Sequence, residues 1–151
     1  MAGRARVRAP SLDKHLPNKA ALEAALIAAG FEESAATFAA ATDGAAEPLT
    51  ALATAYREFV KRHPQLYRLM TEGPLPRGQL TPGLEERAAA PLVRAAGSPE
   101  RARAVFAFLH GMLILELNGR FPDDGGLEPA WRAGLAAFNP TAVAHEVPSI
   151  S

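Results

Sequence analysis

Apolar residues recur three or four positions apart along most of this chain, and short breaks divide them into segments. The first segment, residues 19–41, keeps its glutamates off the apolar stripe and follows Asn18, a residue that caps helix starts well. Gly44 permits a chain reversal directly after it. The segment predicts one long amphipathic helix with the stripe Leu22, Leu26, Ile27, Phe31, Ala35 and Phe38.

The same spacing predicts five more helices. Pro64 separates the first two, because the residue before a proline is pushed out of the helical region. Residues 73–83 are dense in proline and glycine and predict a loop. Few residues are β-branched, so the fold class is all-α, a bundle of about six to seven helices. The further helices are expected over residues 48–63, 65–71, 84–96, 98–118 and 127–138.

The helix expected over residues 98–118 is apolar almost all round. Ser98 and Pro99 give it a clear start, since serine caps a helix and proline suits the first helical position. A helix that is apolar on every side has to be covered on every side. Its own core and something further must therefore pack against it.

Composition narrows the class of protein. A length of 151 residues with 48% apolar content suits one compact domain. The absence of cysteine excludes disulfides, thiol nucleophiles and thiolate metal sites. The sequence shows no signal peptide and no apolar run of membrane-spanning length, so we expect a cytoplasmic protein.

No pattern typical of an enzyme or a metal site occurs. The chain has no phosphate-binding loop and no nucleophile elbow, and its paired acids fall on polar faces or in loops. The four histidines, at positions 15, 63, 110 and 145, lack the spacing of metal ligands. We therefore expect no catalytic residue, no metal and no cofactor.

Charge is unevenly distributed along the chain. The sixteen basic and sixteen acidic residues cancel overall, but residues 1–20 hold five basic residues and one acidic residue. Any contact with a polyanion is therefore expected at the N-terminus.

Three segments resemble a known family. Residues 7–22, Val-Arg-Ala-Pro-Ser-Leu-Asp-Lys-His-Leu-Pro-Asn-Lys-Ala-Ala-Leu, are similar to the junction between the DNA-reading helix and the long connecting helix in TetR/AcrR transcription regulators. Residues 55–70 and 108–116 resemble the subgroup of that family named for a Trp-His-Gly motif. Leu109 stands in place of the tryptophan, whereas the histidine and glycine are retained. The resemblance runs from Met1 to Phe138.

Members of this family join an N-terminal three-helix DNA-binding unit to a helical ligand-binding and dimerisation domain. The resemblance therefore implies a truncated helix-turn-helix remnant over residues 1–17, a ligand-binding and dimerisation domain over 18–140, and a flexible tail over 141–151. Aligned in this way, the chain lacks the first helix of the unit and most of the second. The remnant is either a relic or the product of a start site placed too far downstream.

The remnant alone is not expected to bind DNA. A reading helix depends on the two helices that support its back, and residues 10–16 are too few to hold a helix alone. Operator DNA is a partner only if the missing helices are present. The candidate DNA-binding residues Lys14, His15 and Lys19 match family positions at or near the DNA backbone, and solvated charge at a helix start is the alternative explanation.

The resemblance also implies a hydrophobic small-molecule effector bound between the helices. Apolar residues with a few polar groups suit such a pocket, and plain core packing is the alternative for each of them. A buried histidine needs a hydrogen-bond partner, which an effector or the core itself could supply. The expected ligand-binding residues are Tyr56, Phe59, Tyr67, Met70, Phe106, His110 and Met112. We expect Glu116, if buried, to pair with Arg120 one turn later.

A homodimer is the expected assembly. The helix over residues 98–118 and the last helix are expected to pair with their twofold copies, with Gly134 allowing close approach, whereas the alternative buries these faces in a larger monomer core. The expected dimerisation residues are Leu109, Leu113, Leu117, Trp131 and Leu135.

The sequence is thus interpreted as the ligand-sensing and dimerisation domain of a TetR-family transcription regulator. The alternative is a stand-alone module that binds a small molecule or forms heterodimers without binding DNA. Neither interpretation involves catalysis or contact with a membrane.

Overall fold

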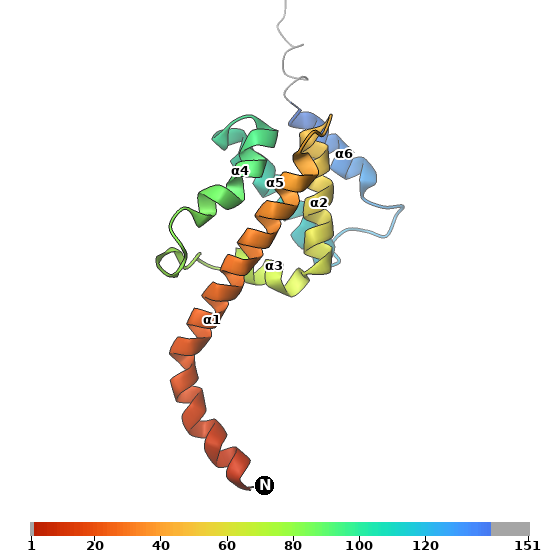
Figure 1. Cartoon of the computed structure of the whole chain (residues 1–151). Helices are drawn as coiled ribbons and strands as arrows, with labels where there is room; N and C mark the ends of the chain where they lie inside the picture. The colour runs from red at the N-terminus through yellow and green to blue at the C-terminus, as the bar shows by residue number, and fades with distance from the viewer. Residues whose placement is uncertain (1, 140–151) are drawn as a thin grey trace, which may run out of the picture.

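The structure, a computed structural model, describes the backbone of residues 2–139 and the side chains of residues 18–139. Within these residues the fold consists of six α-helices and one short 3-10 helix, with no strand, so the predicted all-α class is confirmed. Figure 1 shows the longest helix, α1, crossing the other helices diagonally. The elements are α1 (Ala2–Thr42), α2 (Pro48–Arg62), α3 (Pro64–Thr71), η1 (Arg77–Gln79), α4 (Leu84–Ala96), α5 (Pro99–Leu117) and α6 (Glu128–Ala137).

The start of α1 differs from the prediction. Asn18 does not cap the helix, because α1 runs without a break from Ala2, and residues 10–16 are a part of it and not a separate short helix. Extending a helix that is already packed needs no new nucleus, so α1 continues through these residues although Pro10 and Pro17 each remove a backbone donor. This first part of α1 extends away from the other helices (Figure 1).

The other helices begin and end within two residues of their predicted limits, because local signals define them. His63 leaves the helical region, with φ −129° and ψ 58°, and so separates α2 from α3 before Pro64. The Ser98 hydroxyl accepts a hydrogen bond from the backbone N–H of Arg101 at 3.2 Å and caps α5. The loop predicted over residues 73–83 contains η1, a single 3-10 turn.

The core lies where α5 packs against α2 and α4 beneath α1. One face of α5 contributes Ala102, Val105, Leu109 and Leu113 to it, all four buried. Helix α3 packs closely on α1 because Gly30 has no side chain: a Cβ there would stand 2.5 Å from the sulfur of Met70. None of the helices within residues 2–139 has an apolar stretch long enough to cross a membrane.

Helix α6 packs onto α5 through an aromatic cluster. The Phe108 ring lies 5.6 Å from that of Trp131 and 5.8 Å from that of Phe138. A Cβ on Gly134 would overlap the Phe108 ring. The prediction that Gly134 admits a partner subunit is therefore wrong: it admits a side chain of its own subunit, because the rotation of α6 turns this residue toward α5.

Replacing Gly134 by alanine is expected to destabilise the protein by about 1 kcal/mol. The gain in helix propensity is at most about 1 kcal/mol, whereas overpacking against Phe108 costs about 1–3 kcal/mol. Urea unfolding at one fixed protein concentration measures the change. The double variant Gly134→Ala, Phe108→Leu relieves the overlap and should lose less than the two single changes added together; a Gly134→Ala protein as stable as the parent would contradict the expectation.

Candidate functional site

A hydrogen-bonded chain of three side chains links three helices. The hydroxyl of Tyr56 on α2 lies 2.9 Å from the hydroxyl of Tyr67 on α3, which lies 2.6 Å from Nδ1 of His110 on α5. Both tyrosines are buried, and His110 is half-buried. With the ring proton on Nε2, Tyr67 donates to His110 and Tyr56 donates to Tyr67; a proton on Nδ1 reverses both bonds. The three side chains of this hydrogen-bonded chain therefore respond together to the protonation of His110.

Burial keeps all three groups neutral near pH 7. Burial raises the pKa of Tyr67 to about 12, and the hydrogen bond from Tyr56 offsets this only in part. Burial and the neighbouring Tyr67 raise the pKa of Tyr56 well above 10. Loss of solvent around His110 lowers the pKa of its imidazole. Together these shifts favour a neutral network of donors and acceptors over a charged one.

The other predicted ligand-binding residues surround this chain unevenly. Phe59 is buried, with its ring edge-on to Phe38 at 6.0 Å. Phe106 stacks on His110 at 5.9 Å and is 42% exposed. Met70 and Met112 are half-buried at the border of the core. The set is thus brought together at the junction of α2, α3 and α5, and its outer end, at Phe106 and His110, reaches the surface.

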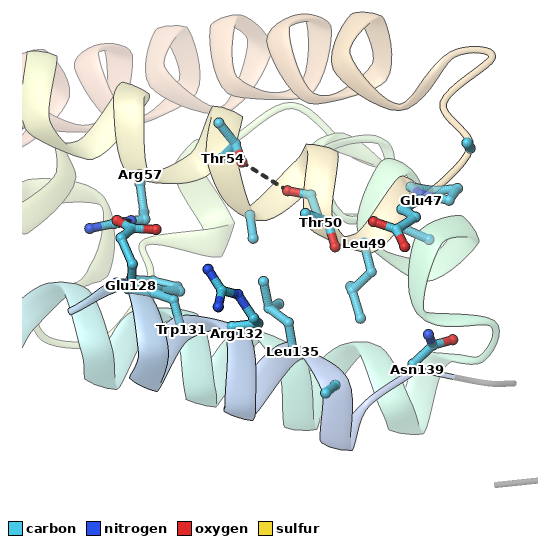
Figure 2. A pocket seen from close by; sticks show the side chains of 15 residues that line it. Glu47, Leu49, Thr50, Thr54, Arg57, Glu128, Trp131, Arg132, Leu135 and Asn139 are labelled. Carbon is cyan, nitrogen blue, oxygen red and sulfur yellow. Dashed lines mark hydrogen bonds and ion pairs between the residues drawn. The ribbon is translucent and has the colours of Figure 1, made fainter. Parts of the chain in front are cut away.

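A groove lies elsewhere, between α2 and α6, and Figure 2 shows it from close by. Its volume is about 800 Å³, and none of the seven predicted ligand-binding residues lines it. A second, smaller hollow of about 540 Å³ at the end of α1 is not lined by them either. The lining of the α2–α6 groove combines apolar residues with arginine and glutamate: Ala46, Glu47, Pro48, Leu49, Thr50, Ala53, Thr54, Arg57, Ala95, Glu128, Trp131, Arg132, Leu135, Ala136 and Asn139.

Arg57 connects α2 to both α5 and α6 at one end of this groove. Its guanidinium donates to Glu128 at 2.7 Å and to Glu116 at 3.4 Å, and it lies over the Trp131 ring, 4.6 Å from the centroid. The hydrogen bond from Arg57 lowers the pKa of the Glu128 carboxyl. Lys61 also pairs with Glu116, at 3.0 Å. This cluster holds α6 against the rest of the bundle.

The predicted pairing of Glu116 with Arg120 is wrong. Helix α5 ends at Leu117, and Gly119 takes a left-handed conformation with φ +61°, so Arg120 lies outside the helix on which one-turn spacing depends. Glu116 turns instead toward the two cations of α2, Arg57 and Lys61.

Three of the five predicted dimerisation residues face the core of their own subunit. Leu109 and Leu113 are completely buried in their own subunit, and Trp131 is 3% exposed, so none of the three has surface to offer a partner. Because α5 is apolar all round, its spacing alone does not distinguish the inner face from the outer one. Leu117 and Leu135 are half-buried and pack at the border of the core.

One stripe of outward-facing residues on α5 and one on α6 are small or apolar. A Cβ on Gly111 would meet no atom within 4 Å, so this part of α5 is open. Phe108 on α5 and Gly134 on α6 form the contact between the two helices. Each of them borders the apolar stripe on its own helix, so the two stripes lie side by side. We call them the outer face: Ala104, Ala107, Gly111, Leu115, Ala130, Ala133 and Ala137.

The predicted DNA-binding residues lie at the start of α1. Lys14 and His15 belong to its helical backbone, and their side chains are outside the described residues. Lys19 pairs with Glu23 at 3.9 Å, and 70% of its side chain is exposed. Among residues 18–139 no three histidine, aspartate or glutamate side chains converge where a metal ion could bind.

Removing the Tyr67 hydroxyl is expected to cost more stability than removing that of Tyr56. Tyr67→Phe breaks two hydrogen bonds and leaves the buried Tyr56 hydroxyl unpaired, a loss of about 1–3 kcal/mol. Tyr56→Phe breaks one bond and leaves Tyr67 paired with His110, a loss of about 1 kcal/mol. Urea unfolding of both variants gives the comparison, and equal losses would show that the three groups do not act as a chain.

High pH provides a second test, because Tyr56 and Tyr67 are the only tyrosines. Both hold pKa values above the ordinary 10, so the folded chain should show little tyrosinate absorbance at pH 10. Since the unfolded chain releases these protons near pH 10 and the folded chain retains them, the free energy of unfolding should fall as the pH rises from 10 toward 12. An absorbance titration and urea unfolding check both statements. Half-ionised tyrosine in the folded protein at pH 10 would contradict them.

Comparison with known proteins identifies a family for most of this chain. A family model described as "Tetracyclin repressor-like, C-terminal domain" matches residues 49–138, or 90 of the 151 residues. No curated protein and no solved structure matches the chain. The matched residues run from the first turn of α2 to the end of α6 and so include the hydrogen-bonded chain, the outer face and most of the residues that line the groove. The chain therefore belongs to the tetracycline repressor-like family, whose C-terminal domain it carries.

Proposed function

We propose that this chain is the ligand-sensing and dimerisation domain of a TetR-family transcription regulator in the cytoplasm. The observation that carries the proposal, beside the family itself, is the outer face of α5 and α6. Seven small or apolar residues stand in two adjoining stripes, and Leu115 among them is 42% exposed. An apolar surface on two neighbouring helices is typical of a protein interface, and two copies placed back to back form a four-helix contact.

The hydrogen-bonded chain is the proposed sensing element. Its outer end, His110 beside the exposed Phe106, is the part that a hydrophobic effector can reach from outside. An effector that takes the hydrogen bond of His110 weakens the link between α5 and α3. Because Met70 of α3 packs against Gly30 of α1, a shift of α3 alters how α1 is seated. Such a ligand shifts the population between two helix arrangements in proportion to its differential affinity for them.

DNA binding in this proposal depends on the helix-turn-helix unit and not on the domain of residues 18–140. Residues 1–17, with Lys14 and His15, are proposed to belong to that unit, and Lys19 adds positive charge nearby. The continuity of α1 through residues 2–42 supports a second candidate, a stand-alone small-molecule-binding or heterodimerising module, because no turn sets a reading helix apart in this segment.

Sedimentation of the Leu115→Glu variant tests the homodimer. The exposed position tolerates glutamate in a single subunit, whereas an unpaired charge buried in an interface costs about 3 kcal/mol or more. We expect the parent chain to sediment as a dimer at micromolar concentration and the variant to dissociate about a hundredfold more readily.

Leu22→Glu is the matched control, since Leu22 is 60% exposed on α1, away from the outer face, and should leave the dimer unchanged. A parent chain that sediments as a monomer would contradict the homodimer and favour the heterodimerising module. Equal effects of the two substitutions would place the interface elsewhere than on α5 and α6.

A further inference from the structure

We propose that the α2–α6 groove binds a small amphipathic carboxylate, whose anionic group replaces Glu128 at Arg57 and is also held by Arg132. The site shares no residue with the hydrogen-bonded chain or the outer face, so the proposal stands or falls independently of the proposed function. It rests on the dimensions of the groove, on the state of its two arginines and on its apolar walls.

The dimensions suit a small molecule. A volume of about 800 Å³ lies within the range of about 300–1,000 Å³ that ligand sites usually show. Leu49 and Leu135 face each other across the groove, as Figure 2 shows, and Ala53, Ala95 and Ala136 extend the apolar lining. An apolar ligand body of one ring or a short alkyl chain therefore fits between the two helices.

Two arginines supply positive charge on one side of this apolar lining. Arg132 points into the groove from α6, and within residues 18–139 it makes no hydrogen bond or ion pair (Figure 2). Its field nevertheless reaches Glu128, whose pKa it helps to lower. Glu47 lies toward the opposite end, near the start of α2. A ligand with its anionic group near Arg132 thus matches the charge of the groove.

The guanidinium of Arg57 is already ordered in a position where it can bind a carboxylate. Glu116 and the Trp131 ring already hold its guanidinium, so an incoming anion does not have to order it. Its remaining partner, Glu128, is 70% exposed and can return to water at little cost, because exposed ion pairs contribute little. Two donors in this cluster, Arg57 Nε and Trp131 Nε1, are buried without an acceptor among the described residues, so Glu116 and Glu128 do not satisfy the cluster completely.

Displacement of Glu128 has a mechanical consequence. The Arg57–Glu128 bond joins α2 to the first turn of α6, and the opposite flank of α6 carries Ala130, Ala133 and Ala137 of the outer face. A carboxylate in the groove replaces the bond between Arg57 and Glu128, which joins two helices, by a bond between Arg57 and the ligand. Binding therefore loosens the first turn of α6, on the helix that borders the outer face.

Trp131 is the only tryptophan in the chain and lines the groove, so its fluorescence reports on occupancy. Octanoate is the probe, with octanamide and octylamine as neutral and cationic analogues of equal length. We expect octanoate to change the fluorescence saturably, and more tightly than either analogue by about tenfold, with binding that weakens as salt is added. No saturable change up to about 10 mM octanoate, or equal binding of the amide, would overturn the proposal.

Two variants test the arginine and glutamate roles. Arg132→Ala should weaken octanoate binding about tenfold, and Arg120→Ala, an exposed arginine outside the groove, should leave it unchanged. Glu128→Gln removes the competing carboxylate and should tighten binding severalfold, an effect that mere damage to the fold does not produce. Equal effects of the two arginine variants, or no tightening by Glu128→Gln, would overturn the site.

Tyr67→Phe separates this site from the proposed sensing element. Because Tyr67 does not line the groove, octanoate should bind this variant as it binds the parent. Loss of octanoate binding by a Tyr67→Phe protein that circular dichroism shows to be folded would place the ligand at the hydrogen-bonded chain and overturn the groove. Sedimentation of the same samples reports on the dimer independently.

Discussion

Burial of the inner face of α5 is the constraint on which the rest of this structure depends. Leu109 and Leu113 are completely buried one turn apart, and burying a leucine side chain is worth about 1.5–3 kcal/mol. That face fixes the rotation of α5 and hence the direction of every other residue on the helix. His110 turns toward α3, Phe108 toward α6, and Gly111 and Leu115 toward the outside. The positions of the hydrogen-bonded chain and of the outer face both follow from the way α5 packs.

Polar contacts add specificity to this apolar core. Tyr56, Tyr67 and His110 each come from a different helix, so their two hydrogen bonds form only when α2, α3 and α5 are in register. An unmade bond would leave a buried hydroxyl unpaired, which is costly in a medium of low polarity. Arg57, the residue after Tyr56, performs the same task on another face of α2, where it links this helix to α5 and α6. The two polar clusters therefore define where the helices lie along their axes.

The sequence predicted the limits of the helices better than it predicted which side of each helix is buried. Pro64, Ser98 and the glycine- and proline-rich loop act locally, so the limits of α2 to α6 were within reach of a single sequence. The start of α1 was not, because the local capping signal of Asn18 was weaker than the continuation of an existing helix. Leu109 and Leu113 were assigned to a partner because an all-round apolar helix does not reveal which side its own subunit covers.

The groove escaped sequence reasoning for a similar reason. Arg57 and Glu128 are 71 positions apart in the sequence, and each on its own resembles a solvated charge. Only the fold shows that they form a hydrogen bond and that Arg57 lies over the Trp131 ring. The residues of the hydrogen-bonded chain were within reach as a set, since tyrosines and a histidine among apolar neighbours are conspicuous. Their order, from Tyr56 through Tyr67 to His110, depends on helix packing that no local pattern encodes.

Because α1 is long, a small tilt of this helix produces a large displacement of its N-terminal end. With a rise of about 1.5 Å per residue, the part of α1 from Gly30 back to Ala2 spans about 40 Å, and it extends beyond the bundle. Anchored by its close contact with Met70, the helix acts as a lever whose fulcrum lies near Gly30. A tilt of about 5° about this point displaces the far end by about 4 Å, so repacking of an ångström or two inside the domain is amplified into a change that a neighbouring macromolecule can detect.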